Sequence, residues 1–158
     1  MNEKTKAMNL IGTDVADFML KDQNGNEFRL SENKGKKILL SFHPLAWTPV
    51  CAEQMKSLEN NFETLENLNT IPLGISIDST FCKHAWAESL GIKKVKLLSD
   101  FWPHGDLAKK LNIFREKDGF SERANIILNE EGKIIFVKIY PIPQLPDIEE
   151  IISFLKKE

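Results

Sequence analysis

Two thiols and three imidazoles are the side chains of this 158-residue chain that most readily do chemistry: Cys51 and Cys82, and His43, His84 and His104. A thiolate is a nucleophile and also a metal ligand, so two cysteines indicate redox chemistry, metal binding or no chemistry. A zinc site usually needs cysteines and histidines in close pairs. Only His84 lies near a cysteine, and no second close pair completes a site. We therefore expect redox chemistry, with no metal and no cofactor.

Cys51 stands directly after a sequence that breaks a strand and starts a helix. The run 38–42 is apolar and typical of a buried strand, and apolar residues recur at helical spacing from Pro49 onward. Proline suits the first position of a helix, because its missing N–H would have no partner there. Cys51 then lies in the first turn, where free backbone N–H groups and the helix dipole favour a thiolate. This placement predicts a reactive cysteine.

The alternative is that Cys51 is a small core residue. It shares a helical face with Met55, Leu58 and Phe62, and cysteine is among the residues most often buried. A core position does not require prolines on both sides of Thr48 just before the helix. The flanking residues therefore favour a nucleophile over a core residue.

The elements around Cys51 alternate between strands and helices. Hydrophobic periodicity and turn residues predict an N-terminal hairpin, three strand–helix units, a second hairpin and a closing helix. The predicted strands are 18–20, 27–30, 38–42, 71–77, 96–98, 124–128 and 133–139, and the predicted helices are 49–65, 80–90, 106–111 and 147–157. A mixed sheet with helices on its faces suits this order. We predict one α/β domain over residues 1–158, with an order that resembles a thioredoxin-like fold.

Composition excludes several classes of function. Apolar residues make up 42% of the chain and charged residues 28%, and the formal net charge is −2. With this charge, we expect no strong electrostatic attraction to nucleic acid or to an anionic membrane. The first residues carry charges and no apolar run, and no segment is long and apolar enough to span a bilayer. We expect a cytoplasmic protein with no nucleic-acid or membrane partner.

The residues before Cys51 resemble the peroxiredoxin family. Pro44, Thr48 and Cys51 match its signature of proline, three residues, threonine, two residues and cysteine, and the whole stretch 42–51 is similar. The likeness covers nearly the whole chain and is greatest to the bacterioferritin-comigratory and AhpE-like members. Arg123, just before a predicted strand, is similar to the active-site arginine of the family.

The resemblance implies a thiol peroxidase and a role for each matching residue. Cys51 would be the peroxidatic cysteine, which attacks the distal peroxide oxygen and becomes a sulfenic acid. Arg123 would hold the thiolate and polarise the peroxide through fixed N–H donors. Thr48 would hydrogen-bond the thiolate or the peroxide, and Pro44 would shield the cysteine from water. The chain departs from the family at Gln54, where many members carry an acid, and at Ala16, where a proline is usual.

The resemblance also implies a second thiol that reduces the sulfenic acid, and Cys82 is the internal candidate. It follows possible cap residues at the start of a predicted helix, where a thiolate is again favoured. Some AhpE-like relatives use a cysteine in this region and form an intramolecular disulfide. Other members take an external thiol, and then Cys82 would be buried filler. A disulfide needs Cα atoms within about 7 Å, so local unfolding is expected.

Three further properties follow from the resemblance. No C-terminal cysteine follows the last helix, so resolution across a dimer is not expected. Thioredoxin or another dithiol carrier would complete the cycle, and both a monomer and a homodimer suit the sequence.

Two other functions are alternatives to a peroxidase. One is a thioredoxin-like disulfide reductase, which is weakened because Cys51 lacks a partner at the Cys-x-x-Cys spacing. The other is a redox sensor, which would use the same residues but show no turnover.

Overall fold

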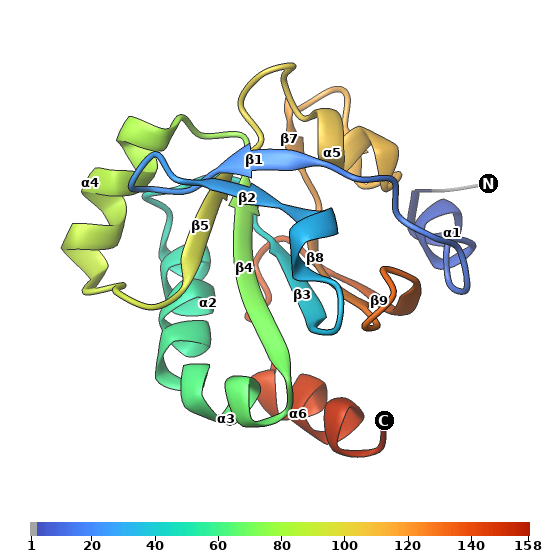
Figure 1. The fold of residues 1–158 in the computed structure, drawn as a ribbon. Coiled ribbons are helices and arrows are strands. Elements are labelled where there is room, and N and C mark those ends of the chain that lie inside the picture. Colours follow the sequence, from blue (N-terminus) through green and yellow to red (C-terminus); the bar gives the residue numbers. More distant parts are fainter. Residues whose placement is uncertain (1–2) are drawn as a thin grey trace.

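A seven-stranded mixed sheet forms the centre of the computed structural model, which describes residues 3–158 (Figure 1). The strands lie in the order β2-β1-β5-β4-β3-β8-β9. Their bounds are β1 Met19–Lys21, β2 Glu27–Arg29, β3 Lys37–Phe42, β4 Thr70–Ser76, β5 Lys96–Ser99, β8 Arg123–Leu128 and β9 Ile134–Tyr140. A separate two-stranded ribbon pairs β6 (Phe114–Arg115) with β7 (Phe120–Ser121).

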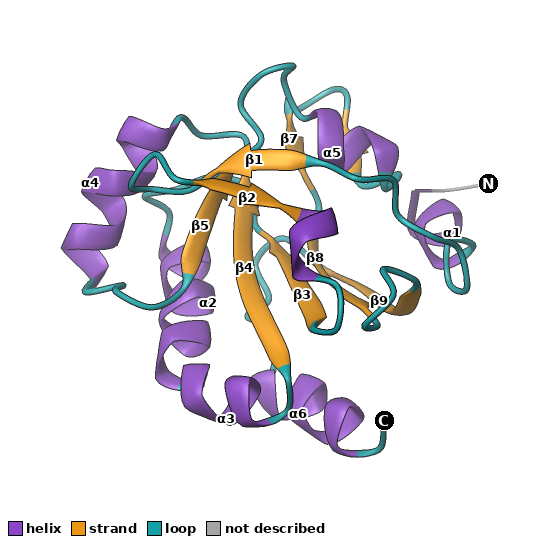
Figure 2. Cartoon of the chain, viewed as in Figure 1, coloured by secondary structure: helices purple, strands orange, loops and turns teal. Residues whose placement is uncertain are grey.

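Helices lie on both sides of this sheet (Figure 2). Their bounds are α1 Glu3–Met8, α2 Pro49–Asn60, α3 Phe62–Asn67, α4 Thr80–Leu90, α5 Asp106–Lys110 and α6 Ile148–Lys156, with a 3₁₀ turn at Leu30–Asn33. The predicted α/β architecture with an N-terminal hairpin is therefore confirmed. Among residues 3–158, no helix is both long enough and apolar enough to cross a bilayer.

Strand direction brings several chain segments to one edge of the sheet. β3, β4 and β5 run parallel, so their carboxyl ends meet at that edge. β8 is antiparallel to β3, with Ala124 opposite Phe42, so the amino end of β8 reaches the same edge. In open α/β sheets, ligands bind outside the carboxyl ends of the parallel strands. Arg123 therefore lies beside the loop that leads into α2.

The alternation of side chains along β3 divides the core into two layers. Ile38 and Leu40 pack in a cluster with α5 and the N-terminal segments. Leu39 points to the other face, into a cluster that contains Cys51 and Trp86. β5, β8 and β9 also contribute to both clusters, because successive side chains of a strand point to opposite sides. Cys51 is thus part of a packed layer and also lies at the edge of the sheet.

The structure differs from the predicted elements where segments are short. The helix expected over 49–65 is broken at Asn61, whose side-chain amide donates to the Ser57 carbonyl at 2.8 Å. Asparagine competes with the helical backbone in this way, which favours a helix end. β6 and β7 have two residues each, too few for a periodic pattern. Helix α1 is also absent from the predicted elements.

Candidate active site

Cys51 lies in the first turn of α2, directly after the loop that leaves β3. Pro49 is the first residue of the helix, as predicted, and Thr48 is its N-cap residue. The Thr48 side chain makes no capping hydrogen bond, so the first N–H groups of α2 keep their positive potential. Cys51 is fully buried and its thiol is free. The site therefore offers a cysteine at an uncapped helix start, away from water.

Arg123 is the cation of this site. Its Nη1 donates to Cys51 Sγ at 3.2 Å, and its Nε donates to the Ile142 carbonyl at 2.8 Å. Arg123 is 3% exposed, so its guanidinium is held by protein groups rather than by solvent. A fixed cation next to sulfur stabilises a thiolate, and its N–H donors suit an oxygen that gains negative charge.

Gln54 orients Arg123 without carrying a charge. Its Oε1 accepts from Arg123 Nη1 at 2.8 Å, while its Nε2 donates to Ser41 Oγ at 2.8 Å and to the Phe42 carbonyl at 3.1 Å. The two acceptors on β3 leave only Oε1 free to face the guanidinium. The Gln54 amide thus orients Arg123 as a carboxylate at this position would. Because the amide is neutral, it does not compete with Cys51 for the positive charge of Arg123.

Thr48 and Pro44 lie in the same loop as Cys51. Pro44 is buried. The Thr48 hydroxyl donates to the Leu45 carbonyl at 2.7 Å. The Thr48 hydroxyl therefore donates within the loop in this structure. Its predicted role, a hydrogen bond to the thiolate or the peroxide, requires the hydroxyl to point toward Cys51 instead.

Cys82 lies in the first turn of α4, and its environment differs from the predicted one. Ser79 caps this helix, because its Oγ accepts from the Cys82 backbone N–H at 3.2 Å. The Cys82 thiol points at Asp78 Oδ1, 3.8 Å away. Burial, and then the Asp78 carboxylate, raise the pKa of Cys82. The expectation of a favoured thiolate is therefore wrong here, because burial and then the adjacent Asp78 carboxylate outweigh the helix dipole.

Three polar residues near the two cysteines were not predicted from the sequence. Asp78 Oδ2 accepts from the Ala46 backbone N–H at 2.9 Å and from Ser76 Oγ at 2.6 Å, which ties the loop before α2 to the start of α4. Lys83 and His43 are fully buried, with Lys83 Nζ 3.4 Å from His43 Nε2. His43 directly precedes Pro44, and Lys83 directly follows Cys82. Their position next to predicted site residues is the sequence feature that could have indicated them.

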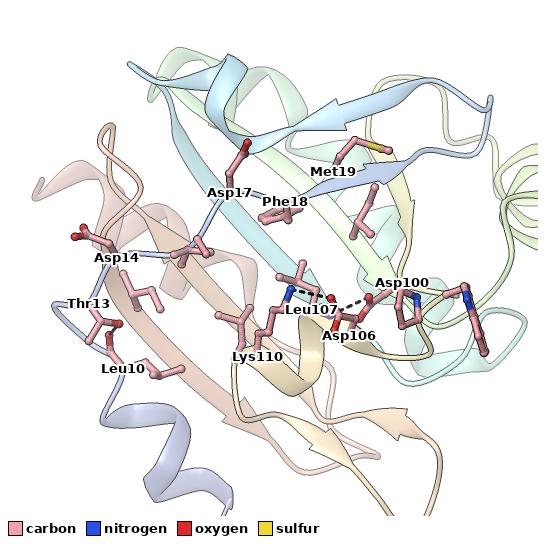
Figure 3. A pocket seen from close by; sticks show the side chains of 17 residues that line it. Leu10, Thr13, Asp14, Asp17, Phe18, Met19, Asp100, Asp106, Leu107 and Lys110 are labelled. Atoms are coloured by element: carbon pink, nitrogen blue, oxygen red, sulfur yellow. Dashed lines mark hydrogen bonds and ion pairs between the residues drawn. The ribbon is translucent and has the colours of Figure 1, made fainter.

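One well-formed pocket is separate from these residues. It has a volume of about 520 Å³ and lies between the N-terminal segment 13–20 and α5, with an Asp106–Lys110 ion pair at its wall (Figure 3). Among the described residues, its lining includes neither cysteine and neither Thr48 nor Arg123. The geometry around Cys51, rather than a large cavity, therefore defines the candidate site.

Comparison with known proteins agrees with this geometry. The model of the AhpC/TSA family matches residues 11–137. The chain belongs to the AhpC/TSA family. It is 33% identical over 130 residues to the alkyl hydroperoxide reductase E of Mycobacterium tuberculosis, covering 82% of this chain and 84% of that protein. It is 29% identical over 153 residues to a peroxiredoxin of Ignicoccus hospitalis, covering 93% of this chain and 64% of that protein.

Solved structures show the same fold. The Enterococcus faecalis AhpC matches with a TM-score of 0.86 and 27% identity, covering 94% of this chain and 91% of that one. The reduced 2-Cys peroxiredoxin of Plasmodium vivax matches with a TM-score of 0.84 and 23% identity, covering 93% and 80%. The resemblance and the thioredoxin-like fold are thus confirmed, and this member of the AhpC/TSA family is an oxidoreductase of the peroxiredoxin kind.

Proposed function

We propose that the protein reduces hydrogen peroxide and organic hydroperoxides through Cys51. The observation that carries the proposal is the 3.2 Å contact from Arg123 Nη1 to Cys51 Sγ. The thiolate attacks the distal oxygen, the sulfur–oxygen bond forms, and the oxygen–oxygen bond breaks. Cys51 becomes a sulfenic acid, and the departing oxygen takes a proton to give water or an alcohol.

Arg123, Thr48 and Pro44 are proposed to align the peroxide. Nη1 of Arg123 faces the sulfur, so its N–H can also bind a peroxide oxygen along the line of attack. Thr48 must turn its hydroxyl from the Leu45 carbonyl to reach the peroxide. Because Cys51 is fully buried, the loop 43–48 must move slightly for peroxide to enter. Pro44, which has no N–H, limits the water that enters with it.

Cys82 is proposed to resolve the sulfenic acid. It is half-buried and free, and Asp78 Oδ1 lies where it can take the thiol proton. Its sulfur then attacks Cys51, and the hydroxide leaves as water with the formation of a disulfide. Cys51 and Cys82 lie on separate helices, α2 and α4, so the first turn of one helix must open before their sulfurs meet.

An external dithiol is proposed to complete the cycle. Thioredoxin or a similar carrier would exchange its two thiols for the disulfide and restore both cysteines. We also propose a cytoplasmic location, which the two free thiols support. A monomer and a homodimer remain the two predicted assemblies.

The test mixes reduced protein with one equivalent of hydrogen peroxide and follows tryptophan fluorescence by stopped flow. Samples quenched with a thiol alkylator are weighed by intact mass spectrometry. Cys51→Ser should abolish fast oxidation, and Cys82→Ser should keep it but stop at the sulfenic acid. If Cys51 reacts no faster than a free thiol, the peroxidase proposal fails. If the wild type also stops at the sulfenic acid, only the role of Cys82 fails.

A further inference from the structure

Apart from the Cys51 sulfur, Arg123 is held in place by neutral groups. Its Nε donates to the Ile142 carbonyl at 2.8 Å, and its Nη1 donates to Gln54 Oε1 at 2.8 Å. Among residues 3–158, no carboxylate lies within ion-pair distance of the Arg123 guanidinium. A neutral acceptor orients a donor only from a well-defined position, because a hydrogen bond is short and directional. The position of the Ile142 carbonyl therefore affects the direction in which Arg123 points.

The Ile142 carbonyl lies in a stiff turn directly after β9. Pro141 and Pro143 flank Ile142, and the ring of each proline fixes its own φ. The backbone N–H of Gln144 donates to the Pro141 carbonyl at 2.9 Å, which closes the turn. Because the turn has little freedom, the Ile142 carbonyl follows the position of the last residue of β9. That residue is Tyr140.

Tyr140 holds the end of β9 against two other elements. It is 2% exposed and lies directly opposite Arg123 in the β8–β9 pair, so the two side chains are neighbours on one face of the sheet. Its hydroxyl donates to Glu150 Oε1 on α6 at 2.7 Å and accepts from Asn125 Nδ2 on β8 at 3.4 Å. The other oxygen of Glu150 accepts from Lys138 Nζ on β9 at 2.6 Å. The hydroxyl thus joins the end of β9 both to α6 and to the strand that carries Arg123.

A purely structural role is the alternative for this hydroxyl. A buried tyrosine usually finds a partner for its O–H, and the bond to Glu150 would satisfy it without any effect on the site. Loss of the hydroxyl would then lower stability and leave the orientation of Arg123 unchanged. The position of Tyr140 favours an additional role, because Ile142, whose carbonyl binds Arg123, lies just beyond it in the chain.

We propose that Tyr140 is a positioning residue for the peroxide reaction. Its bond to Glu150 holds the end of β9 on α6, and this fixes the Ile142 carbonyl. The carbonyl in turn directs Nε of Arg123, so that Nη1 faces Cys51 Sγ. Helix α6 thereby supports the active site through a single hydrogen bond. The inference rests on the roles of Cys51 and Arg123 proposed above.

The first test follows the Arg123 side chain directly. Solvent exchange of the Arg123 Nε–H is measured by ¹⁵N NMR in the reduced wild type and in Tyr140→Phe, with Arg123→Met to assign the signal. The rate is normalised to the backbone amides of β4, the middle strand of the sheet, which report global opening. The normalised exchange should be about tenfold faster in Tyr140→Phe, because local opening alone is expected to change. Equal normalised rates would overturn the proposal.

The second test is a double-mutant cycle on the oxidation of Cys51 by hydrogen peroxide. Tyr140→Phe should slow this oxidation by about tenfold, a part of the loss that a misplacement of about 1 Å can cause. In the Arg123→Met background, Tyr140→Phe should change the rate by less than about twofold, because residues that act through one another are not additive. An equal slowing in both backgrounds, or no slowing in either, would overturn the proposal.

Helix α6 offers a matched pair of variants. Glu150→Ala removes the acceptor of the Tyr140 hydroxyl and keeps the ring, so it should slow oxidation as Tyr140→Phe does. Glu149→Ala removes a carboxylate from the adjacent, exposed position and should leave the rate unchanged. Equal rates in the two glutamate variants would overturn the proposal. Glu150 is only partly buried, so Glu150→Ala keeps the test decisive if Tyr140→Phe does not fold.

The failures of the two proposals are distinguishable. If wild-type Cys51 is slow with peroxide, the peroxidase proposal fails, and the exchange of the Arg123 Nε–H still shows whether Tyr140 holds Arg123. If Arg123→Met oxidises as fast as the wild type, the proposed role of Arg123 fails. If the wild type is fast, Arg123→Met is slow and the cycle shows no coupling, only the positioning role of Tyr140 fails.

Discussion

The first turns of α2 and α4 occupy similar places in the fold, but the charged group next to the cysteine is a cation at α2 and a carboxylate at α4. Each follows a buried parallel strand, and each carries a cysteine in its first turn. At α2 the Thr48 side chain makes no capping hydrogen bond, and Arg123 Nη1 lies 3.2 Å from the sulfur. At α4 Ser79 caps the helix and Asp78 lies 3.8 Å from the sulfur. A helix start by itself therefore does not fix the electrostatic environment of a cysteine, because the neighbouring charged group is a guanidinium at one helix and a carboxylate at the other.

Removal of the Arg123 cation should have the largest effect on the difference between the two cysteines. We expect Arg123→Met to slow the oxidation of Cys51 by about 10²–10³-fold, the usual loss when one fixed donor to a developing charge is removed. Stopped-flow rates with hydrogen peroxide measure this. Arg29→Met is the control, since Arg29 pairs with Asp17 and Glu32 at the surface. Equal rates in the two variants would show that the helix start activates Cys51 without Arg123.

Lys83 joins the two regions, and it should make stability depend on pH. The pKa of Lys83 is about 7 when folded and 10.5 as its ordinary value. Between these values the unfolded chain binds more protons, so the free energy of unfolding should rise with pH, by up to about 1.4 kcal/mol per unit. Urea unfolding of wild type and Lys83→Met from pH 7 upward measures the difference. Parallel curves for the two proteins would contradict a buried titrating amine.

Removal of the Asp78 carboxylate before α4 should have a smaller effect, on the reactivity of Cys82. Asp78→Asn keeps the shape and removes the charge that helps to raise the pKa of Cys82. We expect alkylation of Cys82 near neutral pH to become faster by a few-fold. Cys51→Ser is the background, so that only Cys82 reacts. An unchanged alkylation rate would mean that burial alone keeps Cys82 protonated.

The cap of α4 should have the smallest effect, and it should be confined to stability. Ser79→Ala removes the acceptor of the Cys82 N–H and should lower the free energy of unfolding by about 1 kcal/mol. The first oxidation of Cys51 should not change. Chemical denaturation and stopped flow on the same variant report the two properties. A slower oxidation would show that the cap of α4 also affects the site at α2.

Local sequence was enough to predict the helix start at Pro49, the hairpins and most of the strands, because these depend on periodicity and on turn or cap residues. It also indicated Cys51, Thr48, Pro44 and Arg123 through the resemblance to peroxiredoxins. The short ribbon β6–β7 and the break at Asn61 could not be predicted, since two-residue strands have no period and a single side-chain hydrogen bond ends the helix.

Sequence alone determined which residues could react, and the tertiary structure decided which groups surround them. Arg123 lies 72 positions from Cys51, and only the antiparallel pairing of β3 with β8 brings them together. The environment of Cys82 was predicted wrongly because helix position is a local property, whereas burial and the geometry of Asp78 are not. Lysine is a residue that sequence would place in solvent, and only packing shows that Lys83 is fully buried in α4, with its Nζ next to His43. Electrostatic energy depends on distance and burial, and both come from the folded chain.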